Sequence, residues 1–241
     1  DNNLNYLKSS DPYLAYAKLS SLFKKSSFEE NTHSVHPSAV ISNNCIIGEN
    51  VSIGANVFIG PDCILHDNVI IKANCSLAQD VSIGKNSIIH HGSVLGSDGF
   101  GYAPSKDGYI KIEQIGKLLI EENVEIGANC TIDRGALGDT EIKEGVKLDN
   151  QVHIAHNVIL GKNSAIAASC AIAGSTVIGK NFQMGGLSGV LGHLSIADNV
   201  SIGAHTLITK SINESGNYVG IMPAQKQQDW AKSSIFIKKR V

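Results

Sequence analysis

One aliphatic residue returns every six positions through most of this 241-residue sequence. Ten such residues fall in 41–95, three in 120–132 and twelve in 142–208. A period of six is a multiple of the two-residue strand period and fits no helical period. Hexapeptide periodicity predicts a parallel β-helix, in which three hexads form one triangular coil of about 18 residues. The 25 hexads are enough for about eight coils, held together by stacking between neighbouring coils.

Residues 96–114 interrupt the hexads with a polar, glycine-rich stretch. The chain must leave a corner of the β-helix here as an inserted loop, and long ordered loops are often functional. Glycines beside Phe100 and Tyr102 would let these aromatic rings approach a ligand, so both are predicted to bind substrate. Packing of the loop against a neighbouring subunit is the alternative.

Both ends of the sequence lack the hexad pattern. Residues 11–23 begin with Asp11, a suitable N-cap, and Pro12, which fits the first helical position. Apolar residues then follow at helical spacing, and residues 225–241 also have a helical pattern. The predicted fold class is therefore all-β, a parallel β-helix of hexapeptide repeats with short flanking helices at both ends.

Composition excludes several classes of partner. The net charge of −2 gives no basic face for nucleic acid. No stretch approaches 18 uninterrupted apolar residues, so no membrane span is predicted, and no signal peptide is expected before the first repeat. The five cysteines are odd in number and form no CxxC pair, so neither a disulfide framework nor a zinc cluster is predicted. We expect them to be small buried residues in a reducing cytosol.

The 18-residue coil places distant residues side by side around His156. Gly174 should lie one coil along from His156 on the same edge, and Gly192 one coil further, immediately before His193. Asp149 precedes His156 by seven residues and could orient it. The imidazole would then be flanked by backbone that has no side chain in the way.

This arrangement indicates proton transfer during acyl transfer. Histidine titrates near neutrality and can take a proton from an attacking amine or hydroxyl. An acid on its other nitrogen would fix the tautomer, and the Gly174 N–H could bind the oxyanion of a tetrahedral intermediate. No serine or cysteine nucleophile is implied, which favours direct transfer between two bound substrates. His153 and His156 have no third partner at a matching offset, so no metal site is predicted.

Five segments together resemble the UDP-3-O-acylglucosamine N-acyltransferases of lipid A synthesis, over essentially the whole chain. They are DPYLAYAKLS at 11–20, HPSA at 36–39, GSDGFGY at 96–102, TIDRGAL at 131–137 and LDNQVHIAHN at 148–157. The hexads and the Ile-Ala-His core are shared with the sister O-acyltransferase that acts on UDP-N-acetylglucosamine. The loop, the TIDRGAL segment and the DPYLAYAKLS helix favour the N-acyltransferase.

The resemblance implies a left-handed coil and a homotrimer with active sites in the clefts between subunits. It implies transfer of a 3-hydroxyacyl group from the phosphopantetheine of acyl carrier protein to the glucosamine 2-amine, with no other cofactor, in the cytoplasm of a Gram-negative bacterium. His156 would be the general base, Asp149 its orienting acid and Gly174 the oxyanion donor. His193 would line the site near the donor or the diphosphate, and His153 and Asn150 are predicted to bind substrate.

The same resemblance suggests three parts. Residues 1–30 would be the end of a mostly absent uridine-binding domain with a linker helix, 31–222 the β-helix with its inserted loop 96–114, and 223–241 the start of a C-terminal helical extension. Two alternatives remain open: the sister O-acyltransferase, and a non-catalytic trimer that only binds a sugar nucleotide.

Overall fold

The computed structural model describes residues 8–23, 34–221 and 224–238 and divides the chain into two compact units, Asp1–His33 and Ser34–Val241. The first unit contains helix α1 (Pro12–Ser20) and the short 3₁₀ helix η1 (Ser21–Phe23). Asp11 is its N-cap as predicted, because its carboxylate accepts a hydrogen bond of 2.9 Å from the Leu14 N–H. Helix α2 (Gln227–Lys238) lies near the end of the chain. None of the helices described is long and apolar enough to span a membrane.

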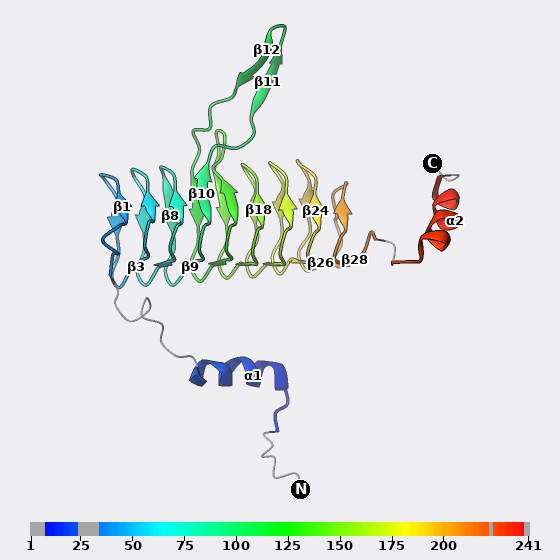
Figure 1. The fold of residues 1–241 in the computed structure, drawn as a ribbon, viewed down its shortest axis with the longest axis horizontal. Helices are drawn as coiled ribbons and strands as arrows, with labels where there is room; N and C mark the ends of the chain where they lie inside the picture. Colours follow the sequence, from blue (N-terminus) through cyan, green and yellow to red (C-terminus); the bar gives the residue numbers. More distant parts are fainter. Residues whose placement is uncertain (1–7, 24–33, 222–223, 239–241) are drawn as a thin grey trace. The chain divides into compact units, whose positions relative to one another are not determined.

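The hexads of the second unit fold into three parallel sheets that form a β-helix (Figure 1). The first sheet contains β1 (Val40–Ile41), β4 (Phe58–Ile59), β7 (Ser76–Leu77), β10 (Val94–Ser97), β15 (Thr131–Asp133), β18 (His153–Ile154), β21 (Ala171–Ile172), β24 (Gly189–Val190) and β27 (Leu207–Ile208). The second contains β2 (Ile46–Ile47), β5 (Ile64–Leu65), β8 (Val81–Ile83), β13 (Leu118–Ile120), β16 (Thr140–Ile142), β19 (Ile159–Leu160), β22 (Val177–Ile178) and β25 (Ser195–Ile196). The third contains β3 (Ser52–Ile53), β6 (Ile70–Ile71), β9 (Ile88–Ile89), β14 (Glu125–Ile126), β17 (Lys147–Leu148), β20 (Ala165–Ile166), β23 (Gln183–Met184), β26 (Val200–Ile202) and β28 (Gly216–Tyr218). The predicted parallel β-helix is confirmed.

The repeated aliphatics stack inside the coil in the predicted register. Ile154 pairs with Ile172, and Ile172 with Val190, at steps of 18 residues. From Val51 onward the stacked side chains have almost no exposed surface, and each contributes about 1.5–3 kcal/mol of burial free energy. The stack is longer than about eight coils, because the first and third sheets each have nine strands; β28, the ninth strand of the third sheet, has no repeat aliphatic of its own.

The corners of the coil follow a second sequence pattern, distinct from the period of the buried aliphatics. The residue three positions before many of the repeated aliphatics has a left-handed backbone, with φ between 55° and 63°. Asn and Asp occupy most of these corners, since their short polar side chains tolerate this conformation best after glycine. Several corner amides also bond one another from coil to coil, as in Asn50–Asn68 at 3.3 Å and Asn68–Asn86 at 3.0 Å.

The cysteines line the inside of these coils. Cys63, Cys75, Cys130 and Cys170 are buried, Cys45 is partly buried, and all five are free thiols. Each of them donates a hydrogen bond to a carbonyl oxygen of the next coil, 3.0 Å away for Cys63. Burial raises the pKa of the Cys63 thiol from 9.0 to about 11.

We therefore expect native protein at pH 8.5 to react with iodoacetamide at Cys45 well before any other cysteine, as measured by peptide mass. The raised pKa of Cys63 also links stability to pH. Burial of the neutral Cys63 thiol contributes to the free energy of unfolding. This contribution is fully present below pH 9 and is lost as pH rises toward 11, since only the thiol of the unfolded chain ionises readily in that window. Rapid alkylation of Cys63 in the folded state would contradict this packing.

The inserted segment 96–114 is more ordered than the predicted loop. It forms an antiparallel hairpin of β11 (Tyr102–Ser105) and β12 (Gly108–Lys111), which extends away from the stacked sheets (Figure 1). Gly108, at φ 120°, is the first residue of β12, directly after the turn between the two strands, and a side chain there would be strained. The segment leaves the β-helix after β10, and the first sheet continues directly from β10 to β15.

Candidate active site

The His156 imidazole lies between two glycines that come from different parts of the chain. His156 follows β18, Gly174 follows β21 on the next coil, and Gly99 belongs to the inserted segment. A Cβ atom added to Gly174 would lie 2.7 Å from His156 Nε2, and one added to Gly99 would lie 2.6 Å from His156 Cβ. The ring is partly exposed rather than buried in the aliphatic stack. Both faces of the site therefore require residues without side chains.

Backbone hydrogen bonds fix the relation between these coils. The Ser175 N–H donates to the His156 carbonyl at 3.0 Å, and the His193 N–H donates to the Gly174 carbonyl at 2.9 Å. The Gly174 N–H has no hydrogen-bond partner among the residues that the structure describes. It lies beside the imidazole and remains available to an acceptor from outside the chain.

Asn157 determines which nitrogen of His156 carries the proton. Its Nδ2 donates to the Gly138 carbonyl at 2.8 Å, and its Oδ1 accepts from the Ala136 N–H at 3.0 Å, so the amide orientation is fixed. The same Oδ1 lies 3.0 Å from His156 Nδ1, which must therefore be the donor. In the neutral ring Nε2 is then unprotonated and faces Gly174, as a general base requires.

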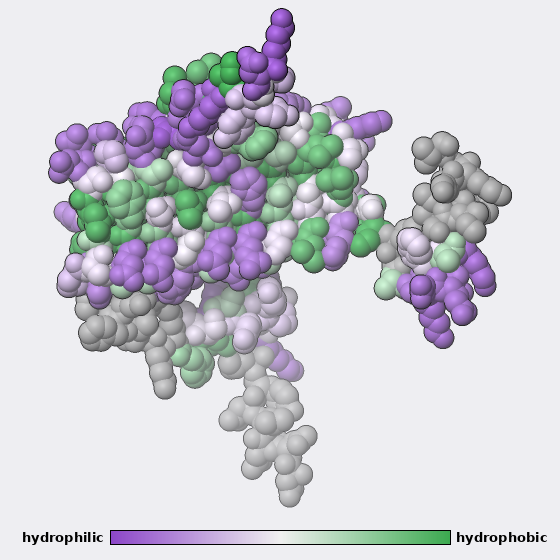
Figure 2. Space-filling view, turned by 45° about the horizontal axis from the view of Figure 1, so that its top comes forward, coloured by the Kyte–Doolittle hydropathy of each residue, from purple (hydrophilic) through white to green (hydrophobic). Residues whose placement is uncertain are grey.

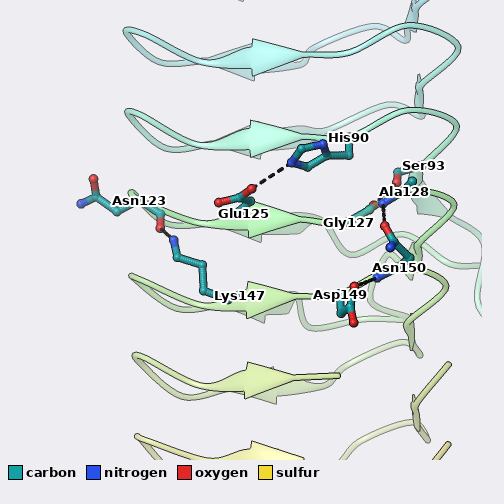
Figure 3. A network of polar contacts seen from close by, with 9 residues as sticks. All are labelled: His90, Ser93, Asn123, Glu125, Gly127, Ala128, Lys147, Asp149 and Asn150. Atoms are coloured by element: carbon teal, nitrogen blue, oxygen red, sulfur yellow. Dashed lines mark hydrogen bonds and ion pairs between the residues drawn. The ribbon is translucent and has the colours of Figure 1, made fainter. Parts of the chain in front are cut away.

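Asp149 and Asn150 lie apart from His156 within one chain. They follow β17 of the third sheet and, with His90, Glu125 and other residues, line a hollow of about 650 Å³ that does not include His156. Figure 3 shows Asp149 and Asn150 beside the strands of this face. The seven residues from Asp149 to His156 turn a corner from the third sheet to the first, so the two residues follow different sheets, and the orienting role of Asp149 stays a prediction.

The polar groups of this hollow largely bond one another. Asp149 Oδ1 accepts from the Asn150 N–H at 2.7 Å, and Asn150 Oδ1 accepts from the Ala128 N–H at 2.8 Å. His90 Nε2 lies 2.9 Å from Glu125 Oε1 across adjacent strands (Figure 3). The Asn150 side-chain oxygen thus already has a structural hydrogen bond, and its role in substrate binding stays a prediction.

Asp133 is an acid near His156 that sequence reasoning missed. It ends β15 and is 8% exposed. Its Oδ1 accepts from the Ser97 hydroxyl at 3.1 Å, and its Oδ2 lies 3.8 Å from His153 Nε2. Burial raises the pKa of the Asp133 carboxyl, while His153, the Ser97 hydrogen bond and His156 act to lower it. The sequence feature that could have identified Asp133 is its position directly after the repeat aliphatic Ile132.

The other predicted site residues lie at the margins of the site. Phe100 is 86% exposed, and its ring contacts Tyr102 edge-to-face with centroids 5.1 Å apart. Phe100 directly follows Gly99, so the inserted segment brings this aromatic pair to the neighbourhood of His156. His193 is an exposed corner residue with φ 61°, one coil beyond Gly174. Within the described part of the chain, no three His, Cys, Asp or Glu residues are grouped to hold a metal ion.

The β-helix and this histidine site define a hexapeptide-repeat transferase. The family described as bacterial transferase hexapeptide (six repeats) matches residues 62–97 and 139–174. Among solved structures, a UDP-N-acetylglucosamine acyltransferase from Bacteroides fragilis is similar, with a TM-score of 0.69 and 26% identity. The match covers 78% of this chain and 71% of that one.

Sequence relatives are more specific. A UDP-3-O-acylglucosamine N-acyltransferase of Delftia acidovorans is 45% identical over 95% of this chain and 68% of its own length. One from Albidiferax ferrireducens is 48% identical over 94% of this chain and 69% of its own. With one from Janthinobacterium sp., at 48% identity, the match spans 63% of this chain and 43% of the relative. The chain belongs to the UDP-3-O-acylglucosamine N-acyltransferase family.

Proposed function

We propose that the chain transfers a 3-hydroxyacyl group from acyl carrier protein to the 2-amine of UDP-3-O-(3-hydroxyacyl)glucosamine in lipid A biosynthesis. The observation that carries this proposal is the His156 imidazole, whose Nδ1 donates to Asn157 and whose Nε2 lies beside Gly174, a residue whose N–H has no partner among the described residues. A base and an oxyanion donor on one edge are what direct acyl transfer requires.

In the proposed reaction the amine nitrogen attacks the thioester carbonyl carbon, and His156 Nε2 takes a proton from the amine. The Gly174 N–H donates a hydrogen bond to the oxyanion of the tetrahedral intermediate. The C–S bond then breaks, and the proton passes from His156 to the leaving sulfur. Asn157 holds Nδ1–H throughout, so the ring presents the same nitrogen to each proton transfer. Asp149 can orient His156 only from a neighbouring copy, because within one chain it lies on another face.

Assembly as a homotrimer is part of the proposal. Figure 2 shows apolar surface along a face of the β-helix, between rows of hydrophilic residues. Large apolar side chains that are exposed in the single chain include Phe58, Val177, Leu191 and Leu207. Burial of such surface between copies of the chain would remove these apolar side chains from water. We place the enzyme in the cytoplasm, together with its acyl carrier protein donor. The exposed Lys226 and Lys232 could bind the acidic surface of acyl carrier protein.

The acceptor distinguishes this activity from its rivals. With 3-hydroxyacyl carrier protein as donor, we expect thiol release and a product one acyl group heavier when the acceptor has a free 2-amine, and neither with UDP-N-acetylglucosamine. Transfer to UDP-N-acetylglucosamine instead would identify the O-acyltransferase. Absence of thiol release with both acceptors would identify a non-catalytic sugar-nucleotide-binding trimer. The family relatives favour the first result, since the chain is 45–48% identical to proteins named N-acyltransferase.

A further inference from the structure

Asp133 is a mostly buried carboxylate that lacks a full cationic partner. Its side chain retains 11% of its surface, so the group is enclosed but still reachable. Oδ1 is occupied by the Ser97 hydroxyl. Among the residues that the structure describes, Oδ2 accepts no hydrogen bond, and its ion-pair neighbour, His153 Nε2, is 3.8 Å away, beyond hydrogen-bond distance. Among the described residues no lysine or arginine forms an ion pair with Asp133.

The neighbouring Arg134 bonds other groups and not Asp133. Arg134 is 4% exposed; its Nε donates to the Gly116 carbonyl at 2.8 Å, and its Nη2 lies 3.4 Å from Asp80. These contacts tie the end of the inserted segment to the β-helix. A buried carboxylate without a paired cation is costly, so an N–H donor that reaches Oδ2 would recover free energy there.

The position of Asp133 connects this oxygen to the catalytic histidine. A bulge at Gly96 shifts the register between β10 and β15, so that Ser97 rather than Gly96 lies opposite Asp133. Two residues further on, Gly99 packs against His156. His153, three residues before His156, faces Asp133 and is held by the Thr131 hydroxyl at 2.8 Å from its Nδ1. The short segment from Ser97 to Gly99 therefore contacts Asp133 through Ser97 and His156 through Gly99.

We propose that Asp133 Oδ2 binds the amine of the acceptor sugar, with His153 closing the same subsite. This inference rests on the proposed function and assigns the amine a partner other than the base. The amine donates one N–H to Oδ2 and a second to His156 Nε2, leaving its lone pair for the thioester carbon. When the C–N bond forms, the second proton moves to His156, and Asp133 keeps its hydrogen bond to the nitrogen. Asp133 thereby recognises an amine in preference to a hydroxyl.

Binding of two acceptors to the intact protein tests this assignment. One is UDP-3-O-acylglucosamine with its free 2-amine, and the other is the analogue with a hydroxyl in place of that amine. Calorimetric titration should show that Asp133→Asn lowers the affinity for the amine acceptor about 10–100-fold, the scale of a hydrogen bond to a charged group. The affinity for the hydroxyl analogue should fall by less than about 3-fold. Asp62→Asn, an exposed corner acid with φ 58°, is the matched control and should change neither.

If Asp133→Asn lowers the affinity for both acceptors equally, or for neither acceptor, the amine subsite is wrong, while the proposed acyl transfer is unaffected. Failure of the unaltered protein to bind the amine acceptor or to transfer an acyl group to it would overturn the proposed function and this inference with it. Thermal melting checks that the variant folds. If it does not, Ser97→Ala keeps the carboxylate and removes its orienting hydroxyl, and a loss of about 2- to 5-fold confined to the amine acceptor is then required.

Discussion

Replacing His156 with alanine lowers turnover by at least about 100-fold, the usual scale for removal of a general base. The imidazole does not stabilise the aliphatic stack, because it lies on an edge between Gly99 and Gly174, and the variant should fold normally. The measurement is the rate of thiol release from 3-hydroxyacyl carrier protein with the amine acceptor at saturation. The loss should fall on kcat, since the ring acts in the transition state.

The control for this variant is His91→Ala. His91 is an exposed histidine elsewhere on the β-helix whose backbone carbonyl, not its ring, bonds the next coil. It should retain nearly full turnover. Near-normal turnover of the His156→Ala protein would remove the general-base mechanism, whatever the family resemblance.

Gly174→Ala should abolish most activity with little effect on stability, with a loss again of about 100-fold or more. The new Cβ would lie 2.7 Å from His156 Nε2 and 2.8 Å from Cε1, so the imidazole must move out of the position that faces the oxyanion donor. The atoms it meets belong to the end of a side chain rather than to the backbone, and the ring can yield without distorting the coil. Thermal melting should therefore change by only a few degrees while turnover falls.

Gly186→Ala provides the matched control, because Gly174 and Gly186 both stand two residues after a repeat aliphatic. A Cβ at Gly186 would approach only the Ala168 carbonyl, at 3.3 Å, and the Ala167 side chain, at 3.9 Å. This variant should keep its activity. If Gly174→Ala also kept its activity, the oxyanion role of the Gly174 N–H and the position of His156 would both be wrong.

The coil register could be predicted because it depends on one simple physical repeat. Buried aliphatics six residues apart require three strands per coil, and this alone places Gly174 beside His156 and His193 beside Gly174. The left-handed corners were equally readable, since Asn and Asp recur at the same hexad position. They occupy a different hexad position from the buried aliphatics, so the aliphatic period alone does not predict them.

The acids around the site could not be assigned by the same arithmetic. Asp149 is close to His156 in sequence, but spacing does not state which corner of the triangle the chain turns between them. Asp133 meets Ser97 only because the bulge at Gly96 adds one residue to β10, an irregularity that a strict period of six cannot contain. Similarly, the hairpin β11–β12 depends on pairing between residues outside the hexads.

The register of 18 residues also restricts how such a molecule can change in length during evolution. Loss or gain of a single residue within a strand would turn every later side chain to a different face, and His156 would no longer lie beside Gly174. Loss or gain of a complete coil preserves all alignments and displaces everything beyond it by about 4.8 Å, the spacing of neighbouring strands. The separation between His156 and the far end of the β-helix can therefore vary among descendants only in discrete steps.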